Sequence, residues 1–440
     1  MDNSKKKLLK IWADQIWSAA GKGALGKESL RISDIQAVAG PRAGALEMLA
    51  GLDAGKLLRA FAKNDAAVLR QFVPWQFCGE PAVFMAGRYV RVEAGWPGKL
   101  AQTMIRLGDL GSRPKGGGRW VAGKNEYGRT VVPALGDKTP HFLVSGSTGS
   151  GKSISLQSAI LQLSQDPDNS LVLADGKYGE SLNKISHLPG VVGPVAVDGP
   201  GVRAALGWVC KEMRKRYENG GHRGRVIVAI DEFQEWAGDK VFVDLVRRVA
   251  SQGRAAGVHL LMSTQHPTVS AFGDPSVRRN LSGKLALRVD DADASRVAVG
   301  SNLPRADFLL GAGDCYTVSP GNCHRVQIAY VDEKEIGKAG SGQHLFDTWP
   351  EYSGEAVGRV PGRPRRKITH KEIGVSLMSA MESEGRPAFK DRLGAEGLGR
   401  PGSDRASMLL KLGRNVVGWL AEHDVGLCYL DGDGNEWDID

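Results

Sequence analysis

The sequence predicts an α/β fold built on a mainly parallel sheet. An N-terminal helical and then α+β part precedes it, and a small C-terminal part follows. Short apolar runs alternate with helical stretches between about residues 120 and 350, which is typical of strands joined by covering helices. Strands separated by helices in this way imply a parallel sheet that is covered on both faces. The expected strands are 141–146, 170–175, 225–233, 257–264, 284–289 and 315–319.

The N-terminal part begins with an amphipathic pattern over residues 5–22. Leu8, Trp12 and Ile16 share one helical face, and lysines lie beside it. We expect this helix to pack on its own domain. The alternative is that residues 1–110 meet a membrane or a protein partner. The elements expected next are a helix over 44–62, strands within 82–96 and a short helix over 99–107.

Shifts in composition predict the domain boundaries. GSRPKGGGR (111–119) is a Gly/Pro-rich connector, and VPGRPRRKITHK (360–371) is a basic connector with two prolines. After it, three helical stretches and an Asp-Gly turn between two short strands resemble a winged helix in pattern. The predicted domains are an N-terminal accessory domain (1–115), an α/β domain (116–358), a basic linker (359–371) and a winged-helix-like domain (372–440).

Composition bounds the class of protein. At roughly 150 residues per domain, 440 residues correspond to two to four domains. The formal net charge of +9 is compatible with a polyanionic partner but is too small to demonstrate one. The five cysteines are scattered without a CxxC, which argues against a disulfide scaffold or a zinc ribbon and favours the cytoplasm. No apolar run reaches the roughly 18–20 residues of a membrane span, and no secretory signal is recognised.

The strongest motif is GSTGSGKS, which follows an apolar run and precedes a helical stretch. It fits the phosphate-binding pattern GxxxxGK[ST], whose backbone N–H groups and helix N-terminus surround phosphates. Lys152 is expected to reach the β- and γ-phosphates of ATP, and the Ser153 hydroxyl is expected to bind Mg²⁺. The residues expected to bind the nucleotide are Gly146, Ser147, Thr148, Gly149, Ser150, Gly151, Lys152 and Ser153.

Two later strand ends carry polar residues that suit phosphate chemistry. RVIVAIDEFQEW ends an apolar run in two acids. Asp231 is expected to hold Mg²⁺ through water, and Glu232 is expected to polarise the attacking water. HLLMSTQHP ends in Gln265, whose amide is expected to sense the γ-phosphate or orient that water. The plain alternative for this third strand end is a simple cap.

An arginine from a neighbouring subunit often completes such a site by stabilising charge in the transition state. The basic segment KEMRKRY offers Arg214 and Arg216, and SQGRAAG offers Arg254. We carry Arg216 and Arg254 forward as the candidates. A solvated or intramolecular ion pair is the alternative for each of them.

Six segments, in order, resemble the FtsK/SpoIIIE family of DNA-translocating motors, in the HerA–FtsK branch of RecA-like ATPases. They are GKNEYGRTVVPALGDKTPHFLVSGSTGSGKS, LVLADGKYGESLNKISHLPGVV, ALGWVCKEMRKRY, IDEFQEW, GRAAGVHLLMSTQHP and DFLLGAGDCYTVSP. The resemblance implies a RecA-like motor that hydrolyses ATP with Mg²⁺. It also implies a hexameric ring that pulls double-stranded DNA through its pore. The chain resembles a soluble member without the membrane region, and His266 stands where the family has arginine.

Two other functions stay open at this point. A single-stranded DNA coupling ATPase of conjugation would share these motifs, and so would a protein-export ATPase of the type VII secretion kind. A single P-loop and the lack of a membrane span disfavour the export ATPase. By analogy with family members that lack a membrane anchor, the expected setting is plasmid or mobile-element transfer, or phage DNA handling.

Overall fold

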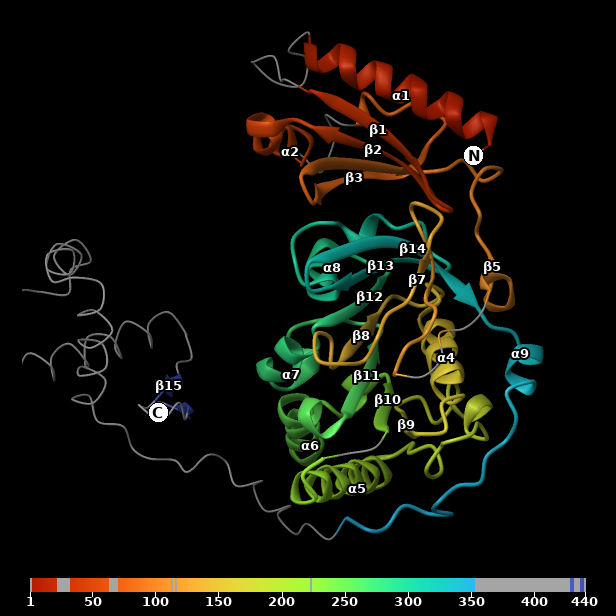
Figure 1. Ribbon diagram of the computed structural model, residues 1–440, viewed down its shortest axis with the longest axis vertical. Helices are drawn as coiled ribbons and strands as arrows, with labels where there is room; N and C mark the ends of the chain where they lie inside the picture. The colour runs from red at the N-terminus through yellow and green to blue at the C-terminus, as the bar shows by residue number, and fades with distance from the viewer. Residues whose placement is uncertain are drawn as a thin grey trace, which may run out of the picture. The chain divides into compact units, whose positions relative to one another are not determined.

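The computed structural model divides into two compact units, residues 1–354 and 355–440 (Figure 1). Within the described residues, the first unit contains a four-stranded sheet and a ten-stranded sheet. No described helix combines the length and the apolar character needed to cross a bilayer. The residues that the structure describes are 2–21, 32–62, 70–111, 114, 117–221, 224–352, 428–430 and 436–438.

The second unit is described at one hairpin. β15 (Cys428–Leu430) pairs antiparallel with β16 (Glu436–Asp438), which confirms the hairpin expected around the Asp-Gly turn. The basic linker (359–371) and the helices predicted after it lie outside the described residues. The winged-helix-like domain therefore stays a prediction, as do the domain boundaries.

The four-stranded sheet is antiparallel and lies in the N-terminal part of the first unit. Helix α1 (Asn3–Gly21) packs against it, and its buried face carries Leu9, Trp12 and Ile16. This packing confirms the expectation that the first helix covers its own domain. The strand order is β1 (Asp34–Ala39), β2 (Ala43–Leu49), β4 (Tyr89–Gly95) and β3 (Cys78–Ala86). Between β2 and β3 lie η1 (Gly51–Asp53) and α2 (Ala54–Ala62).

Two helix predictions in this region are wrong, one in part and one entirely. The helix predicted over 44–62 forms only from Ala54, because residues 43–49 form β2. All but the last residue of β2 are buried, so the segment lacks the polar alternation that marks a strand. The helix predicted over 99–107 is absent among these described residues. The region forms β5 (Ile105–Arg106) and η2 (Leu107–Leu110), since β5 pairs with a strand far along the chain.

One half of the ten-stranded sheet is parallel, as the sequence predicts. The parallel strands, in spatial order, are β12 (Gly283–Leu287), β8 (Phe142–Ser145), β11 (Val258–Thr264), β10 (Arg225–Asp231) and β9 (Asn169–Asp175). Antiparallel strands extend the sheet beyond β12, and the sequence did not predict most of them. They are β13 (Asp314–Ser319), β14 (Asn322–Tyr330), β6 (Gly123–Asn125) and β7 (Thr130–Val131).

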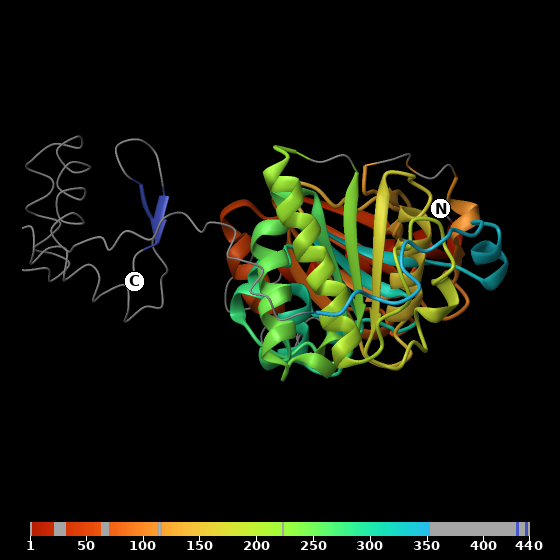
Figure 2. The same ribbon diagram turned by 90° about the horizontal axis from the view of Figure 1, so that it is seen from below.

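Helices cover both faces of the parallel half (Figure 2). α4 (Lys152–Leu163) lies on one face, and α5 (Gly199–Glu218) lies with α6 (Lys240–Gln252) on the other. The P-loop and the acid pair follow β8 and β10, so both lie at the carboxyl edge of the sheet. The remaining short helices are η3 (Asn183–Ile185), η4 (Phe233–Trp236), η5 (Gly253–Ala256), η6 (Ser270–Phe272), α7 (Pro275–Asn280), α8 (Ala292–Val299), η7 (Ala306–Phe308) and α9 (Glu333–Gly337).

Buried charges join the two sheets of the first unit. Arg325 on β14 donates to both carboxylate oxygens of Asp314 on β13, at 2.9 and 2.6 Å. A third nitrogen of Arg325 donates to Glu93 on β4, and the hydroxyl of Tyr316 donates to the same carboxylate. Each of these side chains is buried. Since buried charges are costly unless paired, these contacts fix how the N-terminal sheet docks on β13 and β14.

Candidate active site

A pocket of about 530 Å³ lies at the carboxyl edge of the parallel strands. It gathers residues from the P-loop, from the loop after β9, and from the ends of β10 and β11. Gly146 and Ser150 of the P-loop do not line the pocket, and they lie against each other. A Cβ on Gly146 would meet the Ser150 hydroxyl at 2.4 Å. The predicted site residues that line the pocket are Ser147, Thr148, Gly149, Gly151, Lys152, Ser153, Asp231, Glu232 and Gln265.

The P-loop is braced against the neighbouring strand ends. The Ser147 N–H donates to the carbonyl of Arg288 at 2.8 Å, and the Gly313 N–H donates to the carbonyl of Ser150 at 2.7 Å. Gly151, immediately before α4, has φ of 100°, and an added Cβ would lie 3.1 Å from the Gly313 nitrogen. Glycine meets both demands because it lacks a Cβ. The loop is therefore held open in the shape that a phosphate cradle needs.

The strand order explains how Gln265 reaches the site. β11 lies between β8 and β10, so its end falls between the P-loop and the acid pair. The Thr148 hydroxyl donates to the side-chain oxygen of Gln265 at 3.1 Å. The Gln265 backbone N–H donates to Glu232 Oε2, also at 3.1 Å. Gln265 thus links the P-loop to Glu232.

Lys152 contacts both acids. Its Nζ lies 2.6 Å from Asp231 Oδ1 and 2.9 Å from Glu232 Oε1, and all three side chains are at most 4% exposed. Burial of Asp231 favours its protonated form, but the charge of Lys152 and the hydrogen bonds from Lys152 and Ser263 together outweigh burial and lower the pKa of Asp231 below its ordinary value. The pKa of Glu232 is also lowered, because Lys152 and the hydrogen bond from Gln234 together outweigh burial. Both acids are therefore carboxylates at neutral pH.

Glu232 has an unusual backbone for a side chain of its size. Its φ is 51° and its ψ is 50°, in the left-handed region. This conformation costs of order 1 kcal/mol or more for a residue other than glycine, and it clusters at functional sites. The turn directs the carboxylate into the pocket, where Gln234 Nε2 donates to Oε2 at 2.6 Å. The strained backbone thus belongs to the residue expected to polarise water.

The chemistry of the donors fits a nucleotide with a divalent cation. The half-buried Ser153 hydroxyl and the Asp231 carboxylate line the same pocket and are the hard oxygen ligands that Mg²⁺ prefers. Lys152 and the N-terminus of α4 supply positive charge for phosphates. Ser153 and Asp231 are the residues that would hold the metal, and Glu232 lies beside them.

The sequence did not identify several residues at this site. Asp175 pairs directly with Asp231 in the register of β9 and β10, and its buried side chain holds the loop that follows β9. The Ser263 hydroxyl on β11 donates to Asp231. Lys177 and Lys184 line the pocket wall formed by that loop. The sequence did offer one signal for Asp175, which is the acid at the end of the predicted strand 170–175. The carboxyl ends of parallel strands lie at one edge of a sheet, so this acid could have been placed near Asp231.

The two candidate arginines differ in their surroundings. Arg216 donates to Glu212 Oε1 at 3.0 Å and to the carbonyls of Gly224 and Ala256, at 3.3 and 3.0 Å. Arg254 is exposed in η5. Neither lines the pocket of its own chain. A role for either one in a neighbouring subunit stays a prediction.

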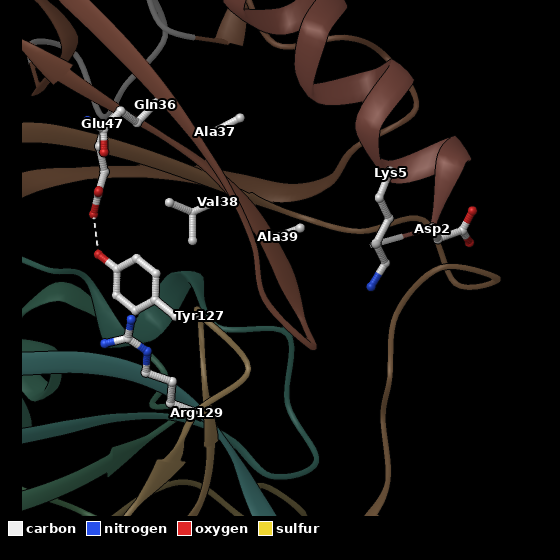
Figure 3. Close-up of a pocket in the computed structure, with 9 residues that line it drawn as sticks. All are labelled: Asp2, Lys5, Gln36, Ala37, Val38, Ala39, Glu47, Tyr127 and Arg129. Carbon is white, nitrogen blue, oxygen red and sulfur yellow. Dashed lines mark hydrogen bonds between the residues drawn. The ribbon is translucent and has the colours of Figure 1, made fainter.

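A second pocket, of about 560 Å³, lies between β1 and the hairpin of β6 and β7 (Figure 3). Lys5, Tyr127 and Arg129 line it, and the Tyr127 hydroxyl donates to Glu47 at 2.5 Å. None of the predicted site residues lines this second pocket. The pocket at the P-loop is therefore the candidate active site.

Comparisons with known proteins agree with this geometry. Residues 120–229 match the model of the FtsK/SpoIIIE family. The DNA translocase FtsK of Leptospira interrogans (strain Fiocruz L1-130) is 30% identical over 304 residues, which cover 59% of this chain and 32% of the relative. The DNA translocase SpoIIIE of Bacillus subtilis (strain 168) is 28% identical over 304 residues, covering 58% of this chain and 38% of the relative.

Among solved structures, the pCW3 conjugation coupling protein TcpA, in its monomer form with ATPgS, has a similar fold. Its TM-score is 0.50 at 17% identity, and the match covers 77% of this chain and 99% of that one. The chain spans about a third of the length of the curated relatives it matches. The family match includes the P-loop and extends into β10. Residues 120–229, which carry this P-loop, therefore resemble the FtsK/SpoIIIE family.

Proposed function

We propose that the chain is an ATP-driven translocase of double-stranded DNA that acts as a ring. The observation that carries this proposal is the contact of Lys152, Asp231 and Glu232 in one pocket, in a domain whose curated relatives are named DNA translocases. An intact lysine and an intact second acid support hydrolysis, since a binding module needs only the first acid.

The residues would divide the work as follows. The P-loop amides and Lys152 bind the β- and γ-phosphates, while Ser153 and Asp231 hold the metal. A bound Mg²⁺ would supply positive charge at the phosphate oxygens. Glu232 accepts a proton from the attacking water, and Gln265 couples the P-loop to Glu232 through its side chain and backbone. Positioning and charge do most of the catalysis in phosphoryl transfer, so these roles suffice for hydrolysis.

The ring, its hexameric form and the arginine acting in trans are further parts of the proposal. Arg254 is the better candidate for the trans role, because it is exposed whereas Arg216 holds three acceptors of its own chain. Tracking along DNA needs contacts to phosphates rather than base reading, so binding should weaken strongly with salt. A cytoplasmic location, a partner for residues 1–110 and a role in mobile-element transfer or phage DNA handling complete the proposal.

The deciding experiment is a steady-state ATPase assay with no polymer, with linear double-stranded DNA and with single-stranded DNA. Glu232→Gln serves as the blank. A large rise with double-stranded DNA supports the translocase, and displacement of a triplex-forming strand then measures translocation. A rise with single-stranded DNA alone would replace it with a coupling ATPase. A response to neither DNA, with hydrolysis intact, would point to a protein substrate.

A further inference from the structure

Lys177 contacts the carboxylate that is expected to activate water. Its Nζ lies 3.3 Å from Glu232 Oε1, the oxygen that Lys152 Nζ also approaches, at 2.9 Å. Lys177 is 42% exposed, whereas Lys152 and Glu232 are 4% and 1% exposed. Two cations therefore share one carboxylate oxygen, and the outer one reaches it from solvent.

Hydrogen bonds to Asp175 fix the backbone of the loop that carries Lys177. The buried carboxylate of Asp175 accepts the backbone N–H groups of Lys177, Ser181 and Leu182, at 2.8, 2.9 and 3.0 Å. Three such bonds to one ionised acceptor are strong, because charge-assisted hydrogen bonds exceed neutral ones. The backbone under Lys177 is thus held in one conformation.

The same loop packs directly against the turn that carries Glu232. The Gly176 N–H donates to the Asp231 carbonyl at 3.0 Å. A Cβ on Gly176 would lie 2.7 Å from the Glu232 carbonyl oxygen, so only glycine allows this approach. The position of Lys177 relative to Glu232 is therefore set by backbone contacts on both sides, not by the flexible side chain alone.

The other oxygen of Glu232 is already held. Gln234 Nε2 donates to Oε2 at 2.6 Å, and the Gln265 N–H donates to it at 3.1 Å. Oε1 depends on the two lysines. If Lys152 moves to the phosphates of a bound nucleotide, Lys177 is the cation that remains beside Oε1.

We propose that Lys177 is a positioning residue for Glu232, which keeps the carboxylate in place when Lys152 turns to the phosphates. This inference rests on the proposed ATP hydrolysis. Lys177 acts through Glu232, so its loss should lower turnover while nucleotide binding is preserved.

The test compares Lys177→Met and Lys177→Arg in the full chain with ATP and Mg²⁺. Lys177→Met is expected to lower kcat roughly tenfold or more with KM within about twofold, and Lys177→Arg is expected to restore most of the rate. In a Glu232→Gln background, Lys177→Met should have no further effect on the residual rate. Lys138→Met, at an exposed lysine outside the pocket, is the matched control and should leave kcat unchanged.

A second readout needs no nucleotide. In the nucleotide-free protein, Lys177→Met should lower the melting temperature more in a Lys152→Met background than in the wild type, since Glu232 then loses both lysines. Equal shifts in the two backgrounds would overturn the inference, as would a Lys177→Met change confined to KM, which would assign Lys177 to direct phosphate binding. Wild-type protein that fails to hydrolyse ATP would sink the proposed function instead, and the melting experiment would still report the contact.

Discussion

Glu93 on β4 accepts a hydrogen bond of 2.9 Å from Nη1 of Arg325 on β14, so a buried ion pair joins the four-stranded sheet to the ten-stranded sheet. Nε and Nη2 of Arg325 donate hydrogen bonds to the two carboxylate oxygens of Asp314. One guanidinium therefore bridges two buried acids from two sheets. The N-terminal domain is part of the same packed unit as the active site, and not an appendage to it.

Replacing Arg325 with methionine should destabilise the first unit by about 3–5 kcal/mol, because Asp314 would lose the cation that holds both of its oxygens, and Glu93 would keep the more distant Arg91 at 3.8 Å. The measurement is urea unfolding of the full chain, followed at its first transition. Arg296→Met is the control, since Arg296 and its partner Asp293 are 58% and 87% exposed. That exposed pair should change stability by less than about 1 kcal/mol. Equal losses for both variants would contradict the role of the buried pair.

Lys152→Ala should abolish ATP binding and any translocation, because the phosphates lose their principal cation. The same change should also lower the melting temperature of the nucleotide-free protein, since Asp231 and Glu232 lose the charge that lowers their pKa values. Fluorescence of a labelled ATP analogue measures the first effect and thermal unfolding the second. Retained nucleotide binding would refute the assignment of the P-loop.

Glu232→Gln should bind ATP with near wild-type affinity while hydrolysis falls by about 10²–10⁴-fold, because the amide cannot accept the proton from water. Single-turnover hydrolysis with a parallel binding titration separates the two effects. Gln is nearly isosteric with Glu, so the strained turn at this position should survive. A hydrolysis rate close to that of the wild type would mean that another residue positions the water.

Acid should destabilise the fold through His141. Burial, aided by the nearby His259, lowers the pKa of His141 to about 3, while the unfolded value is near 6.5. Below pH of about 6.5 the unfolded chain binds a proton that the folded chain refuses, so stability falls as the pH drops toward 3. The slope from this group approaches about 1.4 kcal/mol per pH unit. Above pH of about 6.5, both states hold the ring neutral and the slope vanishes.

Urea unfolding at pH 7.5 and 5.5 measures this slope. His141 Nδ1 accepts the Leu260 N–H at 2.9 Å, and Nε2 faces the Ala250 carbonyl at 3.1 Å, so the neutral ring satisfies both neighbours. His141→Gln should remove part of the pH dependence even though it lowers stability at both pH values. His266→Gln, at an exposed histidine, should leave the pH dependence intact. The same slope in both variants would exclude His141 as its source.

The parallel half of the sheet and the acid pair could be predicted because each depends on local sequence. Residues 226–230 of β10 are all apolar, and Asp231 and Glu232 follow them directly. β2 was mistaken for helix because tertiary contacts cover both of its faces, and a fully buried strand shows no alternation. Lys177 could not be recognised because its importance depends on β9 lying next to β10, and sequence patterns do not determine strand order.

The pairing of Glu93 with Arg325 also has a consequence for synthesis on the ribosome. The two residues are 232 positions apart, so at 5–20 residues per second Glu93 is synthesised roughly 10–50 s before Arg325. Within its own sheet, Arg91 lies 3.8 Å from Glu93. A charged group such as Glu93 stays hydrated until its partner has been synthesised. An exposed apolar surface in its place would attract other nascent chains. The contact of the first translated sheet with Arg325 therefore forms only when β14 has been made.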